Sequence, residues 1–278
     1  MVVKIITDST SDISFDLARE LDIEIVPMYV RFGNQLYRDG IDMSSAELMR
    51  KLETTSLKLA TSQPSPSDLL KVYSKYSENY DGIISIHISS KISGTYESAL
   101  IAEGMVKGKC KIEVIDSKIN SAGLALVVIQ ASRMAAAGEK IDTITKWVKH
   151  IINQTKMLGV FDTMKYLARG GRVNKAIANI GAFLNIKPLL TFKDGEIIRA
   201  GMVRTFPRGI ERLYQFVAKR NNIEELAIAH SAIPEIAEEF KERLGNIFPV
   251  NRIFVMQLGA ALGIHGGPGV LLVALIGG

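Results

Sequence analysis

The chain has 278 residues, of which 47% are hydrophobic and 23% are charged, and its formal net charge is +5. This balance is typical of a globular protein with one large or two ordinary domains, and it excludes a disordered or fibrous chain. The single cysteine, Cys110, excludes a disulfide framework and a paired-cysteine metal site. It fits a reducing compartment, so we expect the protein to be cytoplasmic.

Continuous apolar runs and helical patterns alternate in the first half of the chain. Buried strands are predicted at residues 2–7, 23–32, 82–88 and 111–115. Helices are predicted at residues 44–52, 69–76, 99–106 and 124–137. This alternation favours a parallel, doubly wound sheet with helices on both faces.

The pattern changes after about residue 155. Strands at 187–192 and 196–203 flank an Asp-Gly pair, which is typical of a hairpin turn. Further strands are predicted at 157–161, 226–230 and 250–256, with helices at 207–220 and 234–244. The fold expected is therefore α/β with two domains. Residues 1–155 form a parallel-sheet α/β/α domain, residues 156–278 form an α/β domain with a mixed sheet, and a ligand binds between them.

The carboxyl-terminal segment, residues 256–278, contains no charged residue and is long enough to span a bilayer. However, His-Gly-Gly-Pro-Gly at 265–269 interrupts it, and a helix rarely continues through such a sequence. We expect two buried strands around a turn and no stable membrane insertion.

Charge is concentrated in residues 165–212, where ten basic and three acidic residues give a net charge of +7. A local basic face indicates an anionic ligand or partner. The aromatic residues of this segment are not interleaved with the basic ones as in a base-stacking surface, so no nucleic acid partner is expected.

Familiar catalytic motifs are absent from the sequence. It has no Walker A motif, no Gly-x-Gly-x-x-Gly after the first strand, no His-Glu-x-x-His and no Gly-x-Ser-x-Gly. The four histidines do not have metal-ligand spacing, so neither a metal nor a cofactor is predicted. His87 lies in an apolar strand and is interpreted as a hydrogen-bonded core residue.

Hydroxyl-bearing residues collect in four loops, at residues 7–11, 61–66, 89–95 and 116–121. At the carboxyl ends of parallel strands such loops converge, and helix N-termini there attract anions. Each loop taken alone is explained by helix capping. Thr61 and Ser62 together with Ser93 leave a binding role open.

His265 precedes a Gly-Gly-Pro-Gly turn, in which glycines let the backbone approach a ligand closely. Hydroxyl groups and a histidine, with no acidic residue paired to the histidine, are typical of a site that binds a carboxylate. The alternative is an autonomous serine-dependent acyl hydrolase or acyltransferase, with Ser93 as nucleophile and His265 as base. That reading needs a third, orienting group, which the sequence does not offer.

Several motifs, in order and over nearly the whole chain, resemble those of the DegV family. They are Asp-Ser-Thr-Ser-Asp at 8–12, Thr-Ser-Gln-Pro at 61–64, Ser-Gly-Thr-Tyr-Glu-Ser-Ala at 93–99, Asp-Thr at 162–163 with Tyr-Leu at 166–167, Arg-Gly-Gly-Arg at 169–172, Lys-Pro-Leu-Leu at 187–190 and His-Gly-Gly-Pro-Gly at 265–269. The resemblance implies a protein that is not catalytic alone and holds a long-chain fatty acid in a buried tunnel. It implies the acyl-carrying subunit of a bacterial fatty acid kinase, in which a separate ATP-dependent subunit phosphorylates the bound carboxylate. The acyl-phosphate then feeds phospholipid synthesis.

The resemblance also implies roles for individual residues. Thr61, Ser62, Ser93 and His265 would hold the carboxylate. Arg169, Arg172 and Arg204 would face the kinase subunit or the phosphoryl group, although the sequence around Arg204 is less lysine-rich than the family pattern. Supporting loops would contain Ser9, Gly94, Thr95, Gly266 and Gly267. The apolar stretch at residues 177–190 is expected to form part of the tunnel wall.

Overall fold

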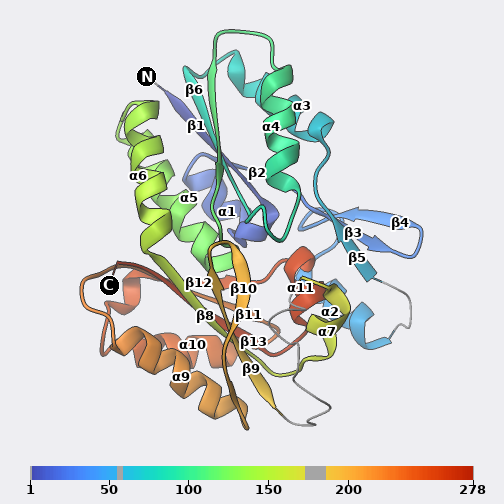
Figure 1. The fold of residues 1–278 in the computed structure, drawn as a ribbon, viewed down its shortest axis with the longest axis vertical. Helices are drawn as coiled ribbons and strands as arrows, with labels where there is room; N and C mark the ends of the chain where they lie inside the picture. Colours follow the sequence, from blue (N-terminus) through green and yellow to red (C-terminus); the bar gives the residue numbers. More distant parts are fainter. Residues whose placement is uncertain (1, 55–58, 173–185, 278) are drawn as a thin grey trace.

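The computed structural model describes residues 2–54, 59–172 and 186–277. The first sheet along the chain is parallel. Its strand order is β2-β1-β6-β7, with β1 at Val3–Asp8, β2 at Ile23–Val26, β6 at Gly82–His87 and β7 at Lys111–Asp116. Helices α3 (Pro66–Ser77) and α4 (Thr95–Met105) pack on one face (Figure 1). The other face is covered by α1 (Phe15–Glu20), α5 (Ser121–Ala136) and α6 (Ile141–Gln154). The predicted α/β/α arrangement is confirmed.

A small antiparallel sheet was not predicted. It has the order β4-β3-β5, with β3 at Tyr29–Phe32, β4 at Gln35–Arg38 and β5 at Leu59–Ser62, and α2 (Ser45–Thr54) follows β4. The prediction of one strand over residues 23–32 was wrong, because the chain leaves the parallel sheet at Pro27. Proline lacks the N–H that a ladder needs. At Met28 the N–H donates to Ser9 Oγ (3.0 Å), which holds the chain at the crossing between the two sheets.

The second large sheet is mixed, as predicted. Its order is β10-β9-β8-β13-β11-β12, and within it only β11 and β12 pair in parallel. The strands are β8 (Thr155–Phe161), β9 (Lys187–Lys193), β10 (Glu196–Val203), β11 (Ile223–Ser231), β12 (Ile253–Gln257) and β13 (Val270–Gly277). Helices α9 (Phe206–Ala218) and α10 (Pro234–Leu244) pack on one face, and α7 (Lys165–Gly170) follows β8.

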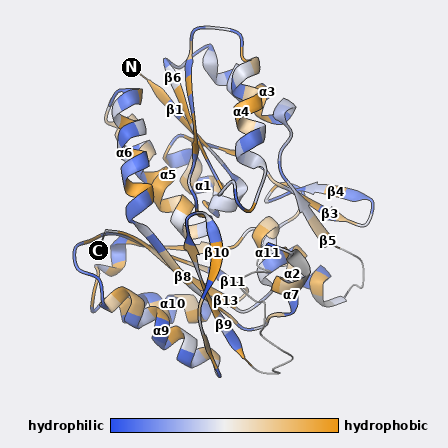
Figure 2. Cartoon of the chain, viewed as in Figure 1, coloured by the Kyte–Doolittle hydropathy of each residue, from blue (hydrophilic) through white to orange (hydrophobic). Residues whose placement is uncertain are grey.

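Helix α5 lies between the two large sheets. One continuous core joins its side chains to Ile5 and Ile84 of the parallel sheet and to Ala229 and Leu272 of the mixed sheet. Because α5 is packed on both sides, eleven of its sixteen residues are buried. Figure 2 shows the hydrophobic character of α5. Helix α5 therefore fixes the two sheets relative to each other.

The carboxyl-terminal prediction was half wrong. Strand β13 follows the Gly-Gly-Pro-Gly turn as predicted, but a helix, α11 (Ala260–Gly266), precedes it. The first free N–H groups of α11 are satisfied by carboxylates far away in the sequence. Gly259 N donates to Asp12 Oδ1 (2.8 Å) and Ala260 N donates to Asp39 Oδ1 (2.7 Å). In the described parts of the chain, no helix has the length and apolar character needed to cross a bilayer.

Candidate functional site

A cavity of about 350 Å³ lies between the parallel sheet, the small sheet and the mixed sheet. This volume falls within the range of about 300–1,000 Å³ found for small-molecule sites. Three of the four hydroxyl-rich loops reach it after β1, β6 and β7, whereas the fourth comes from β5 of the small sheet and not from the parallel sheet as predicted. None of the described lining residues is acidic.

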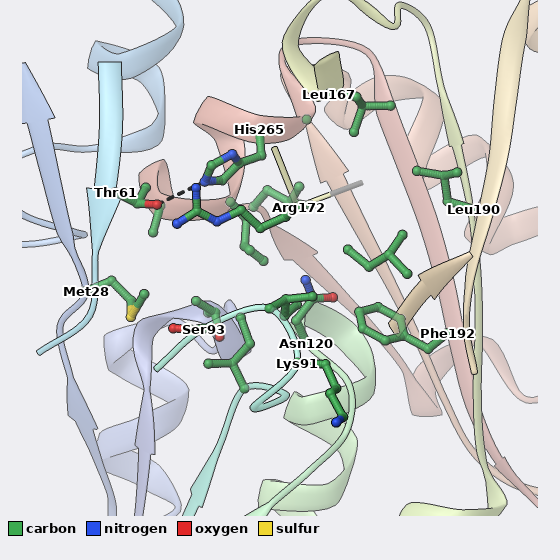
Figure 3. A pocket seen from close by; sticks show the side chains of 18 of the residues that line it. Met28, Thr61, Lys91, Ser93, Asn120, Leu167, Arg172, Leu190, Phe192 and His265 are labelled. Carbon is green, nitrogen blue, oxygen red and sulfur yellow. Dashed lines mark hydrogen bonds between the residues drawn. The ribbon is translucent and has the colours of Figure 1, made fainter. Parts of the chain in front are cut away.

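Most of the wall is apolar. It comprises Met28, Ile88, Ile92, Met157, Phe161, Leu167, Leu190, Phe192, Ile197, Leu258, Leu262 and Leu272. In Figure 3, Leu167, Leu190 and Phe192 stand on the side away from Thr61 and His265. Of the predicted wall at residues 177–190, Leu190 is part of the lining, and residues 177–185 lie outside the described part of the chain.

The polar end is centred on Thr61 and His265. Thr61 is the penultimate residue of β5 and His265 occupies the last turn of α11, and their Oγ1 and Nε2 atoms are 3.0 Å apart. His265 Nδ1 is buried and has no hydrogen-bond partner among the described residues. An unpartnered ring nitrogen is less costly as an acceptor than as an N–H donor, so we place the proton on Nε2. The Thr61 hydroxyl then accepts from the ring and is free to donate into the cavity.

Burial and the nearby Arg172 guanidinium lower the pKa of His265 to about 4. At neutral pH the imidazole is therefore uncharged, and Arg172 supplies positive charge at this end of the cavity. Figure 3 shows the Arg172 guanidinium beside the His265 ring. Arg172, for which the resemblance implied a partner-facing or phosphoryl-facing role, belongs to the cavity lining.

The other two arginines of that group are placed differently. Arg204 is exposed, follows the end of β10 and does not line the cavity. It lies at the opposite end of the β9–β10 hairpin from the turn at Gly195, which approaches Ser89. Arg169 lies in α7, and its side chain is outside the described part of the structure.

Ser62, Ser93 and Gly94 line the cavity together with Thr61. Ser93 Oγ is 2.8 Å from Thr95 Oγ1, and Thr95 itself is fully buried behind it. A Cβ atom on Gly94 would lie 2.4 Å from Gln63 Nε2. A larger residue at Gly94 would therefore displace the Gln63 side chain, which also lines the cavity.

Of the remaining residues predicted to support the site, Gly266 lines the cavity, and Ser9 and Gly267 lie outside its lining. Ser9 Oγ donates to Asp39 Oδ2 (2.7 Å) and does not reach the cavity. Gly267 has a φ of +72°, and a Cβ there would lie 2.0 Å from the Tyr166 ring. Gly267 therefore allows the chain to turn from α11 towards β13.

His87 is a hydrogen-bonded core residue, as predicted. Its Nδ1 is 3.0 Å from Asp8 Oδ2 and its Nε2 is 2.7 Å from Ser85 Oγ, and all three side chains are fully buried. Although these residue types match a hydrolase triad, Ser85 does not line the cavity. Asp8 also accepts from the backbone N–H groups of Thr10 (3.1 Å) and Ile88 (3.0 Å), so the cluster positions two segments of the cavity wall.

Sequence reasoning did not single out Thr10, Lys91, Asn120 and Thr191, which also line the cavity. Thr10 and Asn120 lie within loops already noted for their polar residues, and this was the available signal. Thr191 lies inside a predicted strand, where nothing in the sequence distinguishes a cavity-facing residue from a core residue.

The comparisons with known proteins agree with this geometry. Residues 2–277 match the model of the DegV family, described as uncharacterised proteins. A DegV domain-containing protein of Caldanaerobacter subterraneus subsp. tengcongensis is 34% identical over 270 residues, covering 96% of this chain and 95% of the relative. Two solved structures superpose with a TM-score of 0.90 and cover 100% of both chains. They are a DegV family protein from Thermus thermophilus described by its fatty acid binding (30% identical), and DegV from Bacillus subtilis, described as a fatty acid binding protein (28% identical). The chain belongs to the DegV family.

Proposed function

We propose that the protein binds a long-chain fatty acid in the cavity, with its carboxylate at the polar end and its tail along the apolar wall. The separation of the polar residues around Thr61 and His265 from the apolar side chains of Leu167, Leu190 and Phe192 carries this proposal. Thr61, Ser62 and Ser93 offer hydroxyl groups without a competing acidic residue, and His265 orients the Thr61 hydroxyl towards the cavity. Arg172 adds the positive charge that a buried carboxylate needs. The solved relatives from Thermus thermophilus and Bacillus subtilis, described as binding fatty acids, support it.

Protein purified from a bacterial host is expected to carry a fatty acid in a one-to-one complex. Each buried methylene contributes about 0.8 kcal/mol, so a long acyl chain retains a large net stabilisation after the cost of ordering it. Native mass spectrometry, followed by extraction and chromatography of the released acid, checks this. Protein that is free of lipid and takes up no added palmitate would contradict the proposal.

We further propose that the bound acid is presented to a separate ATP-dependent kinase subunit, which converts the carboxylate to an acyl-phosphate. The sequence has no phosphate-cradling glycine loop of its own, and the net charge of +7 in residues 165–212 favours an acidic partner. Loaded protein with ATP and Mg²⁺ is expected to form no acyl-phosphate until a fatty acid kinase subunit is added. Hydroxylamine trapping measures the product, and acyl-phosphate formed without the subunit would overturn this division of labour.

The geometry does not favour the alternative of a serine hydrolase. His265 Nε2 is hydrogen-bonded to Thr61, whereas Ser93 is bonded to Thr95. A general base must reach the proton that it removes. Ser93 is therefore assigned to ligand binding, and turnover of an activated acyl ester that is lost in Ser93→Ala would reverse this assignment.

A further inference from the structure

Asn120 lines the cavity, and its side chain makes no hydrogen bond to a described residue. It precedes α5 as the N-cap residue, and its exposed fraction is 9%. Asparagine at this position ordinarily caps the helix through its side chain, but here the side chain makes no capping bond. Figure 3 shows its amide end pointing into the cavity, and no described residue pairs with it.

The other hydroxyls of the wall outside the polar end are already paired within the protein. Thr10 Oγ1 donates to Asp8 Oδ1 (2.5 Å), Ser90 Oγ donates to Asp116 Oδ2 (2.6 Å) and Thr191 Oγ1 donates to the Met157 carbonyl (2.6 Å). Asn120 differs from these three, because its amide makes no hydrogen bond to a described residue and faces the cavity. A polar group that faces a largely apolar cavity is costly unless it is hydrogen-bonded, so its partner is expected to come from the contents of the cavity.

We propose that Asn120 is a second polar subsite, which recognises a hydroxyl or keto oxygen on the acyl chain. The inference rests on the proposed fatty acid binding. It adds that fatty acids with an oxygen atom on the acyl chain are the preferred ligands. An amide both donates and accepts, so it pairs with a hydroxyl in either direction and with a keto oxygen through its N–H. An unsubstituted acyl chain leaves the Asn120 amide without a partner. Its affinity is therefore expected to be lower than that of an oxygenated acid of equal length.

The test compares palmitate with hydroxypalmitates that carry the hydroxyl near the carboxylate, at mid-chain or near the methyl end. Delipidated protein is titrated in competition with a fluorescent fatty acid. Wild type is expected to bind one of the three hydroxypalmitates about three- to tenfold more tightly than palmitate, the ratio expected for one neutral hydrogen bond. In Asn120→Leu, which has a similar volume, we expect palmitate to bind more tightly than every hydroxypalmitate.

Thr191→Val is the matched control, because Thr191 also lines the cavity but its hydroxyl is bonded to Met157. Its ratio of hydroxypalmitate to palmitate affinity is expected to equal that of wild type. Asn120→Ala gives the same comparison if leucine disturbs the fold, which circular dichroism detects. Equal affinity of wild type for palmitate and all three hydroxypalmitates means that water satisfies the amide, and it overturns this inference while fatty acid binding stands. No binding of any acid would instead refute the proposed function.

Discussion

Arg172→Ala is expected to weaken fatty acid binding by about ten- to a hundredfold. A hydrogen-bonded charge facing a carboxylate contributes about 1.5–3 kcal/mol, and His265 is uncharged at neutral pH and cannot replace it. The same substitution is expected to raise the pKa of His265, since the nearby guanidinium is one of the two causes that lower it. Isothermal titration with palmitate and an NMR titration of the imidazole measure the two effects.

Arg204→Ala is the control for this experiment, because both arginines are exposed but only Arg172 lines the cavity. Its affinity for palmitate is expected to equal that of wild type. Arg172→Lys, which keeps the charge but loses the planar fork, is expected to fall between wild type and Arg172→Ala. If Arg172→Ala binds palmitate as tightly as wild type but loses kinase-dependent turnover, Arg172 contacts the kinase subunit and not the fatty acid.

Asp12→Asn is expected to change how stability depends on pH. Burial raises the pKa of Asp12 to about 8, so the folded protein holds a proton that the unfolded chain releases near pH 4. A raised folded-state pKa means that stability from this group is complete below the unfolded pKa and is lost as pH rises from about 4 to about 8. Each pKa unit corresponds to about 1.4 kcal/mol, so the expected loss is several kcal/mol.

The asparagine variant removes this titration while keeping an oxygen for Gly259 N and a polar partner for Ser121 Oγ. We expect it to be more stable than wild type at pH 8 and to lack the decline between pH 4 and 8. Asp12→Ala is expected to be less stable than Asp12→Asn at every pH, since it leaves Gly259 N without an acceptor. Urea unfolding at several pH values gives the free energies, and parallel pH profiles for wild type and Asp12→Asn would refute the assignment.

The fold class followed from local patterns because each buried strand is a continuous apolar run and each helix has its own period. The two errors have different causes. Strand β2 ends just before Pro27, which is a local signal that the prediction overlooked, and the following chain is then held by Ser9. Helix α11 begins where Asp12 and Asp39 supply its caps, more than two hundred residues away. No local pattern carries that information.

The sequence predicted the residues of the candidate site where a hydrogen-bonding side chain lies in a loop or at the end of a strand or helix. Thr61, Ser62, Ser93 and His265 come together at one cavity, and their role there remains a proposal. The placement of Arg172 beside His265 could not be read from the sequence, because glycines precede it and leave the direction of the loop open. Asn120 was missed for a different reason, since an asparagine before a helix is ordinarily explained as a cap.

Helix α5 has a consequence for the cooperativity of the molecule. Its apolar surface is shared between Ile84 of one sheet and Leu272 of the other, so neither sheet completes a core without it. If the chain were cut after α5, the N-terminal part would expose the apolar face of α5, and the mixed sheet would lose the helix that covers it. Because the core is shared in this way, we expect the two halves to unfold together, although larger chains often unfold in separate steps.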